Sequence, residues 1–374
     1  VKKNDMKLNR NFHLYDIRSI TSIEPNKVEF VFSPNSHLMN TSNNVFSGNP
    51  PKEKVVIQIE SPRVGSIVQG IRQSYVNITK GFPPEILMQV SLNPENDLPV
   101  EPPADTVLHG WMDTYAAYSN YYGTFTSKPL MQYFIDISER FDSRVLDLTN
   151  APGIESNTEL SIKNLEHIAN SLRFNSYFRS LTANHTTRRT LVPLVATVMQ
   201  SNPFITELRL TNISEGNSMI YQITDAMQTN TKHSIQIIDF SNTRIKDRTA
   251  ISLAKALCGI RHNLKVLNLA NCNLSTKSLM NIIANGLHGN LGMSLTIEEL
   301  NLSNNKMNEA VLVSFGQWLN NVKAYSNLRK LSVSNVSNPN LTPVLHTLAG
   351  FAKLEQVDVS FNKIEPIQGQ LIQS

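Results

Sequence analysis

One pattern of apolar and polar positions repeats through the C-terminal two-thirds of the chain. Each copy has apolar residues at positions 1, 4 and 6, with variable or polar residues at positions 2, 3 and 5. Clear copies begin at Ile205, Ile235, Leu264, Ile297, Leu328 and Leu354, and weaker ones include residues 178–183 and 145–148. The residue at position 4 recurs every 26 to 35 residues, which predicts a solenoid of stacked repeats.

The pattern predicts one short β-strand in every repeat. Side chains alternate between the two faces of a strand, so Leu267 and Leu269 point inward while Asn268 points outward. One strand cannot bury its apolar face alone, and neighbouring repeats must stack to complete a continuous core. The pattern L-x-x-L-x-L is typical of leucine-rich repeats.

Helical patterns separate these strands. They cover residues 191–200, 250–260, 278–287, 310–322 and 341–349. In the third, Leu279, Ile283 and Leu287 recur at helical spacing and give one apolar stripe. Repeats of about 29 residues with full helices resemble the ribonuclease-inhibitor class. We therefore predict an α/β leucine-rich-repeat solenoid (horseshoe) over residues 143–374, with about eight repeats, a helical convex face and a parallel sheet on the concave face.

Position 9 is the place where the chain turns off each strand. Asn305 and Asn362 occupy it, and a side-chain amide there can satisfy backbone groups of the turn. Cys272 occupies the same position, so we interpret it as a small buried residue rather than a reactive thiol.

A different pattern precedes residue 110. Residues 12–23, 27–32 and 55–60 are rich in β-forming residues, and the polar stretch 33–54 predicts a long loop. Ser61 then predicts an N-cap, with Pro62 at the first position of an amphipathic helix. Strands followed by one helix resemble the end of a pleckstrin-homology (PH) domain, a β-barrel with a C-terminal helix. We predict a partial PH-like domain over residues 1–80, with its first strands upstream of Val1.

Prolines and aromatic residues mark the segment between the two parts. Six prolines in residues 81–110 predict an extended linker. Trp111, Tyr115 and Tyr118 then fall on one helical face, together with Tyr122. An aromatic stripe beside a solenoid end is expected to cover the open core, so residues 111–142 are predicted to form a helical cap.

Charge and cysteine content bear on the compartment and on membrane contact. Two cysteines in 374 residues favour a reducing, cytoplasmic compartment. Residues 1–90 hold eleven Lys and Arg against seven Asp and Glu, whereas the remainder is neutral. The basic residues at the N-terminus are predicted to contact anionic lipid headgroups at ~1 kcal/mol each. They are Lys2, Lys3, Lys7 and Arg10.

Catalytic motifs are missing from the sequence. The nine histidines give no H-x-x-x-H spacing, and the two cysteines give no C-x-x-C. Neither G-x-S-x-G nor G-x-x-x-x-G-K-[ST] occurs. His185 with Arg188 and Arg189 is interpreted as a solvated turn. We predict no catalytic residue, cofactor, metal site or nucleic-acid partner.

Position 5 of the repeats supplies the candidate binding surface, since it lies on the exposed concave face. The predicted partner-binding residues in this column are Arg209, Asp239, Asn268, Asn301 and Asp358. The other members are Asp147, Thr182 and Ser332. None of the eight is Trp or Tyr, which usually anchor binding hot spots, so a solvated face is the competing interpretation.

The order of a PH-like helix, an aromatic cap and ribonuclease-inhibitor-type repeats resembles the CARMIL family, linkers of capping protein, Arp2/3 and myosin I. The similar stretches are Ser61-Pro62-Arg63 through to Lys80-Gly81-Phe82-Pro83, Gly110-Trp111-Met112-Asp113-Thr114-Tyr115, and residues 144–148 continuing to residues 165–181. The resemblance implies a non-enzymatic scaffold that regulates actin assembly at the plasma membrane. It also implies that capping protein, Arp2/3 and myosin I bind regions after the repeats, through which the family dimerises.

Two other functions share this repeat class. A Ran-type GTPase-activating protein would stabilise the nucleotide site of its target with an Arg or Asn, and Arg209 or Asn268 would be the candidates. The PH-like unit and the cap speak against it, since that class does not need them. A tropomodulin-like direct actin binder is the third interpretation.

Overall fold

The computed structural model divides the chain into two compact units. The first unit comprises residues 1–126 and 166–175, and the second comprises residues 127–165 and 176–374. The residues that the structure describes are 12–33, 54–103, 106–141, 143–149, 151–152, 159–185, 191–213, 216–261, 263–336 and 340–362.

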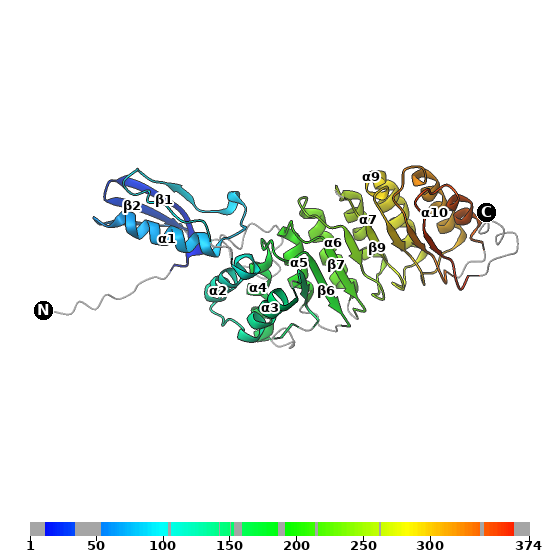
Figure 1. Cartoon of the computed structure of the whole chain (residues 1–374), viewed down its shortest axis with the longest axis horizontal. Coiled ribbons are helices and arrows are strands. Elements are labelled where there is room, and N and C mark those ends of the chain that lie inside the picture. Colours follow the sequence, from blue (N-terminus) through cyan, green and yellow to red (C-terminus); the bar gives the residue numbers. More distant parts are fainter. Residues whose placement is uncertain are drawn as a thin grey trace. The chain divides into compact units, whose positions relative to one another are not determined.

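A four-stranded sheet with one helix forms the N-terminal part of the first unit (Figure 1). The elements are β1 (Ile17–Glu24), β2 (Lys27–Phe32), β3 (Val55–Glu60), α1 (Val64–Ile78) and β4 (Gln89–Ser91). β1, β2 and β3 are antiparallel neighbours, and β4 returns to pair in parallel with β1. Ile20, Val28 and Phe30 project from one face of the sheet and form the core with Val64 and Val68 of α1. Apolar residues that face the core alternate with polar or exposed ones along β2 and β3, and for this reason both strands match their predicted bounds.

The PH-like barrel is not confirmed. In the described part of the first unit the strand order is β3-β2-β1-β4, which leaves β3 and β4 as edges of an open sheet. β4 lies within the proline-rich segment that was predicted to be an extended linker. Its three residues carry no strand pattern of their own, and β1 supplies their hydrogen-bonding partners.

The prediction that Ser61 caps α1 with Pro62 at the first helical position is wrong. The helix begins at Val64, and its N-cap is Arg63, which makes no side-chain capping bond. The Ser61 hydroxyl instead accepts a hydrogen bond from the Arg63 backbone N–H at 3.1 Å. Serine and proline therefore form a turn ahead of the helix, and the apolar stripe alone sets its start.

The predicted aromatic stripe is largely buried within the first unit. It lies on α2 (Trp111–Tyr121), and Trp111, Tyr115 and Tyr118 are at most 1% exposed. Trp111 stacks on Tyr115 with ring centroids 4.9 Å apart and donates a hydrogen bond to Ser171 Oγ at 2.9 Å. Tyr118 packs on Tyr15 with centroids 4.7 Å apart. The stripe thereby joins the start of the sheet to the C-terminal half of α4 (Glu159–Leu172).

Glycine is required where the exit from α1 passes the end of α4. Gly81 has φ +82°, and a Cβ there would lie 2.6 Å from the carbonyl oxygen of Phe174. Gly110 has φ +81° and lies against the Lys80 side chain. A side chain at Gly81 would meet both backbone strain and a backbone atom, so this join tolerates only glycine without rearrangement.

An eight-stranded parallel sheet runs through the second unit, with every strand beside its neighbours in sequence. The strands are β5 (Val145–Asp147), β6 (Ser180–Asn184), β7 (Glu207–Thr211), β8 (Ile237–Asp239), β9 (Val266–Asn268), β10 (Glu299–Asn301), β11 (Lys330–Ser332) and β12 (Gln356–Asp358). The position 4 residues from Leu146 to Leu331 are at most 1% exposed, whereas Val357 on the edge strand is 37% exposed. The predicted inward leucine row is confirmed.

Helices line one side of this sheet, as α5, α6 and α7 do in Figure 1. Besides α4 they are α3 (Lys128–Phe141), α5 (Leu191–Ser201), α6 (Gly216–Thr229), α7 (Asp247–Gly259), α8 (Thr276–Met280), α9 (Leu291–Ser294), α10 (Glu309–Val322) and α11 (Thr342–Leu348). The stripe predicted over residues 278–287 is buried, but its backbone changes from α8 to a π-helix at Asn281–Leu287. The parallel sheet and helices fit the predicted leucine-rich-repeat solenoid.

Asn305 and Asn362 at position 9 hydrogen-bond backbone groups of the turn after their strands, as predicted. Asn305 Nδ2 donates to the carbonyl oxygens of Leu269 at 2.8 Å and Leu302 at 3.0 Å, and its Oδ1 accepts from the Leu274 N–H. Asn362, in the repeat of the edge strand β12, likewise donates to the carbonyl oxygens of Val333 and Val359, and its Oδ1 accepts from the Val336 N–H. Cys272 is completely buried, and its Sγ lies 3.1 Å from the Phe240 carbonyl oxygen.

Two neighbouring substitutions on β9 test the inward and outward assignment. Leu267→Asp puts an unpaired carboxylate at a side chain with 0% exposure, so we expect the free energy of unfolding to fall by several kcal/mol. Asn268→Asp keeps the Oδ1 acceptor on the outer face and should change the free energy of unfolding by less than about 0.5 kcal/mol. Urea unfolding followed by circular dichroism measures both, and equal effects would contradict the assignment.

The two cysteines should differ sharply in reactivity. Burial raises the pKa of the Cys272 thiol to about 12, whereas Cys258 is exposed. In the native protein at neutral pH we expect iodoacetamide to modify Cys258 and to spare Cys272 until the chain unfolds. Mass spectrometry of digested samples reads out both sites. Because the folded state holds the Cys272 proton more tightly, its stabilising effect should be complete below pH 9.0 and decline between pH 9.0 and about 12. Rapid modification of native Cys272 would contradict the buried interpretation.

Candidate functional site

The third residues of the eight repeat strands form one continuous row. Strand register pairs Asp147 with Thr182, Thr182 with Arg209, and so on without a slip to Asp358. Each residue in this row is half-buried. The structure therefore places the predicted partner-binding residues Arg209, Asp239, Asn268, Asn301 and Asp358 on one face. Whether a partner binds them stays a prediction.

Most of the acidic and amide side chains in this row also hold the turn that follows their strand. The Oδ1 atoms of Asp239, Asn268, Asn301 and Asp358 each accept the backbone N–H two residues later, at 3.0 to 3.1 Å. Asp147 makes the same bond at 2.8 Å. An acceptor at this position thus replaces a backbone partner that the departing strand lacks. At Asn268 and Asn301 the oxygen serves the fold, and the amide nitrogen can meet a ligand.

Hydrogen bonds from Ser360 tune the last member of the row. The Ser360 Oγ donates to Asp358 Oδ1 at 2.7 Å, and these bonds lower the pKa of the Asp358 carboxyl. The Asp358 carboxylate therefore remains ionised at a somewhat lower pH than an ordinary aspartate. Asp239 and Asp147 add two more acidic groups to the same row.

Ion pairs across the face compensate other charges. Arg209 Nε lies 3.1 Å from Glu207 Oε2, and Lys330 Nζ lies 2.7 Å from Glu299 Oε1. Their side chains are 33% to 49% exposed, and pairs of this kind contribute about 0–1 kcal/mol each. Arg209 is consequently held by Glu207 of its own strand, and the outer face is polar, with acidic groups at positions 3 and 5.

A row of asparagines at position 8 went unpredicted. Asn212, Asn242, Asn271, Asn304 and Asn335 all have φ between 50° and 58°. Asparagine tolerates this left-handed conformation better than most residues. Neighbouring amides also pair, since Asn271 Nδ2 donates to Asn242 Oδ1 at 2.8 Å and Asn335 Nδ2 to Asn304 Oδ1 at 2.8 Å. The recurrence of Asn four residues after position 4 was the available sequence signal.

The remaining predicted groups stand apart from this face. Lys2, Lys3, Lys7 and Arg10 lie outside the described residues, as do Arg188 and Arg189. His185 is exposed at position 8 with φ 49°, where the five repeats just described carry asparagine and the repeat of β12 carries Phe361. No group of three His, Cys, Asp or Glu in the described ranges could hold a metal ion. Among the described helices, none is both long enough and apolar enough to span a bilayer.

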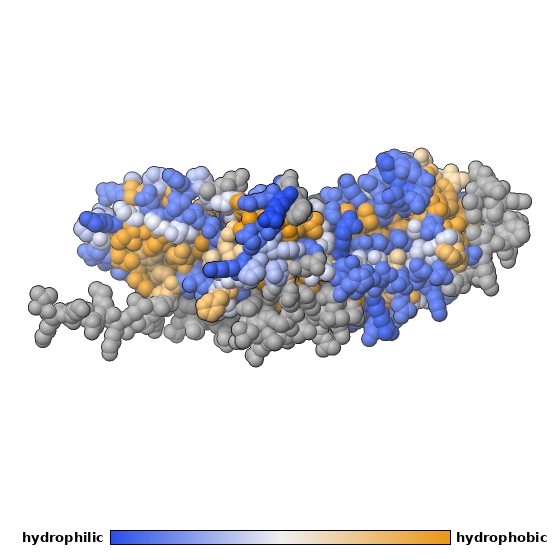
Figure 2. Space-filling model, turned by 60° about the horizontal axis from the view of Figure 1, so that its bottom comes forward, coloured by the Kyte–Doolittle hydropathy of each residue, from blue (hydrophilic) through white to orange (hydrophobic). Residues whose placement is uncertain are grey.

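Surface hydropathy differs between the two units (Figure 2). Orange hydrophobic side chains gather over part of the first unit in this view. Among the large hydrophobic side chains of that unit, Ile23, Val56 and Ile67 are 40% to 53% exposed. Blue hydrophilic side chains predominate on the visible side of the later repeats. A partner of the repeats would therefore meet a mainly polar surface.

Comparisons with known proteins agree with the repeats and with the resemblance to CARMIL. The leucine-rich-repeat family model matches residues 263–285. CARMIL of Dictyostelium discoideum is 23% identical over 365 residues, which is 97% of this chain and 32% of CARMIL. The Rho GTPase-activating protein gacW of the same organism is 25% identical over 206 residues, or 55% of this chain and 18% of gacW.

The similarity to CARMIL crosses both units, whereas the similarity to gacW covers about half of the chain. The chain spans about a third of the length of CARMIL. With the parallel repeat sheet and the match to the repeat model, this breadth leads to one conclusion: the chain is a CARMIL-like leucine-rich-repeat protein.

Proposed function

We propose that this chain belongs to a non-enzymatic scaffold of CARMIL type that regulates the actin cytoskeleton in the cytoplasm, close to the plasma membrane. One observation supports this most strongly: similarity to CARMIL runs through 97% of the chain and so includes the N-terminal sheet and aromatic helix. Repeats alone would not distinguish this function, because many unrelated proteins carry them.

The parts of the chain have separate tasks in this proposal. Residues 1–80 act as the PH-like domain, 81–110 as the linker, 111–142 as the cap and 143–374 as the repeats. The β-sheet with α1 and the aromatic α2 support the first and third of these parts, whereas β4 of the same sheet falls within residues 81–110. Capping protein, Arp2/3 and myosin I are proposed to bind regions outside this chain, which would also dimerise the longer protein. This chain then locates the scaffold and recruits partners.

The outer sheet face is the proposed partner-binding surface of the repeats. Adjacent parallel strands lie about 4.8 Å apart, so position 5 presents Arg209, Asp239, Asn268 and Asn301 as a ladder of polar groups. Asp358 ends that ladder on the edge strand. Short side chains leave the backbone approachable, and stacking holds the ladder rigid, which lowers the entropy cost of binding.

Localisation of the fluorescently tagged chain in a motile cell tests this scaffold role. We expect enrichment at actin-rich cell margins relative to the free tag. Thr182→Arg with Ser332→Arg puts two long cations on the sheet face at positions where a hydroxyl replaces the turn-holding carboxylate or amide. This pair should reduce the enrichment at least about twofold if the face recruits a partner.

The matched control carries the same substitutions away from the sheet, at Ser218 on α6 and at Thr231. Both residues are exposed, so Ser218→Arg with Thr231→Arg should leave the localisation unchanged. A uniform distribution of the unaltered chain would argue against the cytoskeletal role. Equal losses in both variants would remove the sheet face from the proposal.

Weak membrane contact through the N-terminal basic residues is a separate part of the proposal. Lys2, Lys3, Lys7 and Arg10 would each add about 1 kcal/mol at an anionic surface. Binding of the full chain to phosphatidylserine vesicles should fall when NaCl rises from about 50 mM to about 500 mM, because salt shortens the Debye length. Replacing all four residues by Gln should weaken sedimentation with vesicles.

A variant with Gln at Lys128, Lys232, Lys255 and Arg261 serves as the control, since it removes the same charge from the repeat unit. It should sediment like the unaltered chain. Binding that ignores salt, or equal weakening in both variants, would show that the N-terminal charges do not mediate the contact.

Activation of a GTPase is the second candidate function, favoured by the partial similarity to a Rho GTPase-activating protein. Arg209 and Asn268 remain its candidate residues, but Arg209 pairs with Glu207 and Asn268 holds a turn. Stimulated GTP hydrolysis by Rho-class or Ran-class GTPases in the presence of the chain, lost in Arg209→Ala, would favour this function over the scaffold.

A further inference from the structure

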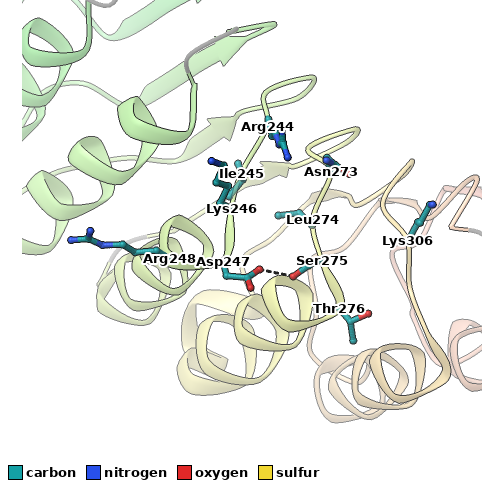
Figure 3. Close-up of a pocket in the computed structure, with 10 residues that line it drawn as sticks. All are labelled: Arg244, Ile245, Lys246, Asp247, Arg248, Asn273, Leu274, Ser275, Thr276 and Lys306. Carbon is teal, nitrogen blue, oxygen red and sulfur yellow. Dashed lines mark hydrogen bonds between the residues drawn. The ribbon is translucent and has the colours of Figure 1, made fainter.

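A pocket opens on the edge of the repeats where three successive strand-to-helix loops lie together (Figure 3). Its volume is about 670 Å³. Residues from the loops after β8, β9 and β10 line it, and the buried side chains of Ile245 and Leu274 contribute its apolar part. This site lies beyond position 9 of the repeats, away from the position 5 row described above.

Cationic side chains stand on two sides of the pocket. Arg244 and Lys246 come from the loop after β8, and Lys306 comes from the loop after β10. All three are exposed. Arg248 also borders the pocket but extends away from it in Figure 3. Its guanidinium lies over the Tyr221 ring, 4.4 Å from the ring centroid. Three cations therefore remain available to an incoming ligand.

The carboxylate among the lining residues is already engaged. Asp247 Oδ1 accepts hydrogen bonds from Ser275 Oγ at 2.5 Å and Ser278 Oγ at 2.8 Å. These bonds lower the pKa of the Asp247 carboxyl and tie α7 to α8. No ion pair joins Asp247 to Arg244, Lys246 or Lys306 in the described part of the chain, and four cations against this one carboxylate leave the lining net positive.

The spacing of the cations suits an extended chain. Arg244, Asn273 and Lys306 occupy position 10 of three successive repeats, so the row reads cation, amide, cation. Strands about 4.8 Å apart place the two ends roughly 10 Å apart. A polyproline-II segment advances about 3.1 Å per residue with three residues per turn, so acidic residues three apart lie on one side of it, about 9 Å apart, and would match both ends. The central Asn273 amide can then bond a peptide group between them.

We propose that this pocket binds an extended acidic segment of a partner protein, with its carboxylates at Arg244, Lys246 and Lys306. Charge complementarity favours this occupant over a basic or apolar one. The distance between the cations favours a peptide segment, because one small anion could not reach cations two repeats apart. The pocket is a hollow between loops, which a peptide can enter and a flat lipid surface cannot. The proposal does not depend on the actin-related function.

The test uses the full chain and a fluorescein-labelled peptide with Glu at every third position, separated by Gly and Ser. Fluorescence anisotropy measures its affinity at about 50 mM NaCl, where charge interactions are least screened. A peptide with Gln in place of Glu should bind at least about tenfold more weakly. The triple variant Arg244→Gln, Lys246→Gln, Lys306→Gln should lose at least about tenfold in affinity for the Glu peptide.

The matched control is Lys232→Gln, Lys255→Gln, Arg261→Gln, which removes the same charge from other exposed sites of the second unit. It should lose less than about twofold. Circular dichroism should show unchanged folding in both variants, since all six side chains are exposed. A second pair, Arg244→Lys with Lys306→Arg, preserves charge and should retain binding.

Three outcomes would overturn the proposal. Equal losses in the pocket and control variants would mean that general charge attraction binds the peptide. Displacement of the peptide by equimolar inorganic phosphate would identify a small-anion site. Binding of phosphatidylserine vesicles, but not of the peptide, in a manner abolished by the pocket variant would identify a lipid site.

Discussion

Burial of the position 4 leucines is the constraint on which the second unit depends. A strand of three residues, such as β9, has too little surface to hold its own inward side chain away from water. Leu267 is completely buried because Ile238 and Leu300 lie on either side in register. Each repeat thus completes the core of its neighbours, and stability arises between repeats rather than within them. The position 4 side chains are therefore inaccessible to a partner, and only the outer sheet face and the loop edges can bind one.

Stacking also creates a demand for polar side chains at fixed places. Every strand ends at a turn whose backbone groups lose their partners, and these must be satisfied locally. Asp239 and Asn268 meet that demand at position 5, and Asn305 meets it at position 9. A column of polar residues on a solenoid face is consequently weak evidence for a ligand, because the fold itself selects carboxylates and amides there. Thr182 and Ser332 are informative exceptions, since the fold tolerates a hydroxyl at the same position.

Local pattern was sufficient wherever burial alone decides the structure. The strands β2 and β3 and the inward row of the repeats could be predicted, because alternation records which face meets the core. α6 was missed although its apolar residues recur at helical spacing as clearly as those of α7, so the signal for this helix was present in the sequence. The Ser61 cap was predicted from residue type, but the Ser61 hydroxyl accepts the Arg63 N–H in the turn that precedes the helix. β4 depends on β1, which lies about seventy residues away in sequence, and local pattern cannot reveal such a partner.

The same repetition explains why the loop edge can carry a charge pattern that the sheet face lacks. Position 10 follows the buried turn residue at position 9, so its side chain is free of the fold's hydrogen-bonding needs. Arg244 and Lys306 are exposed there, and the acidic neighbour Asp247 is tied to hydroxyls of the next repeat. Stacking fixes the distance between equivalent positions of neighbouring repeats. The residue type at position 10 of each repeat therefore sets the sign of the charges along the loop edge and the distances between them. Selectivity for a charged segment can therefore evolve at position 10 without disturbing the leucine row that holds the repeats together.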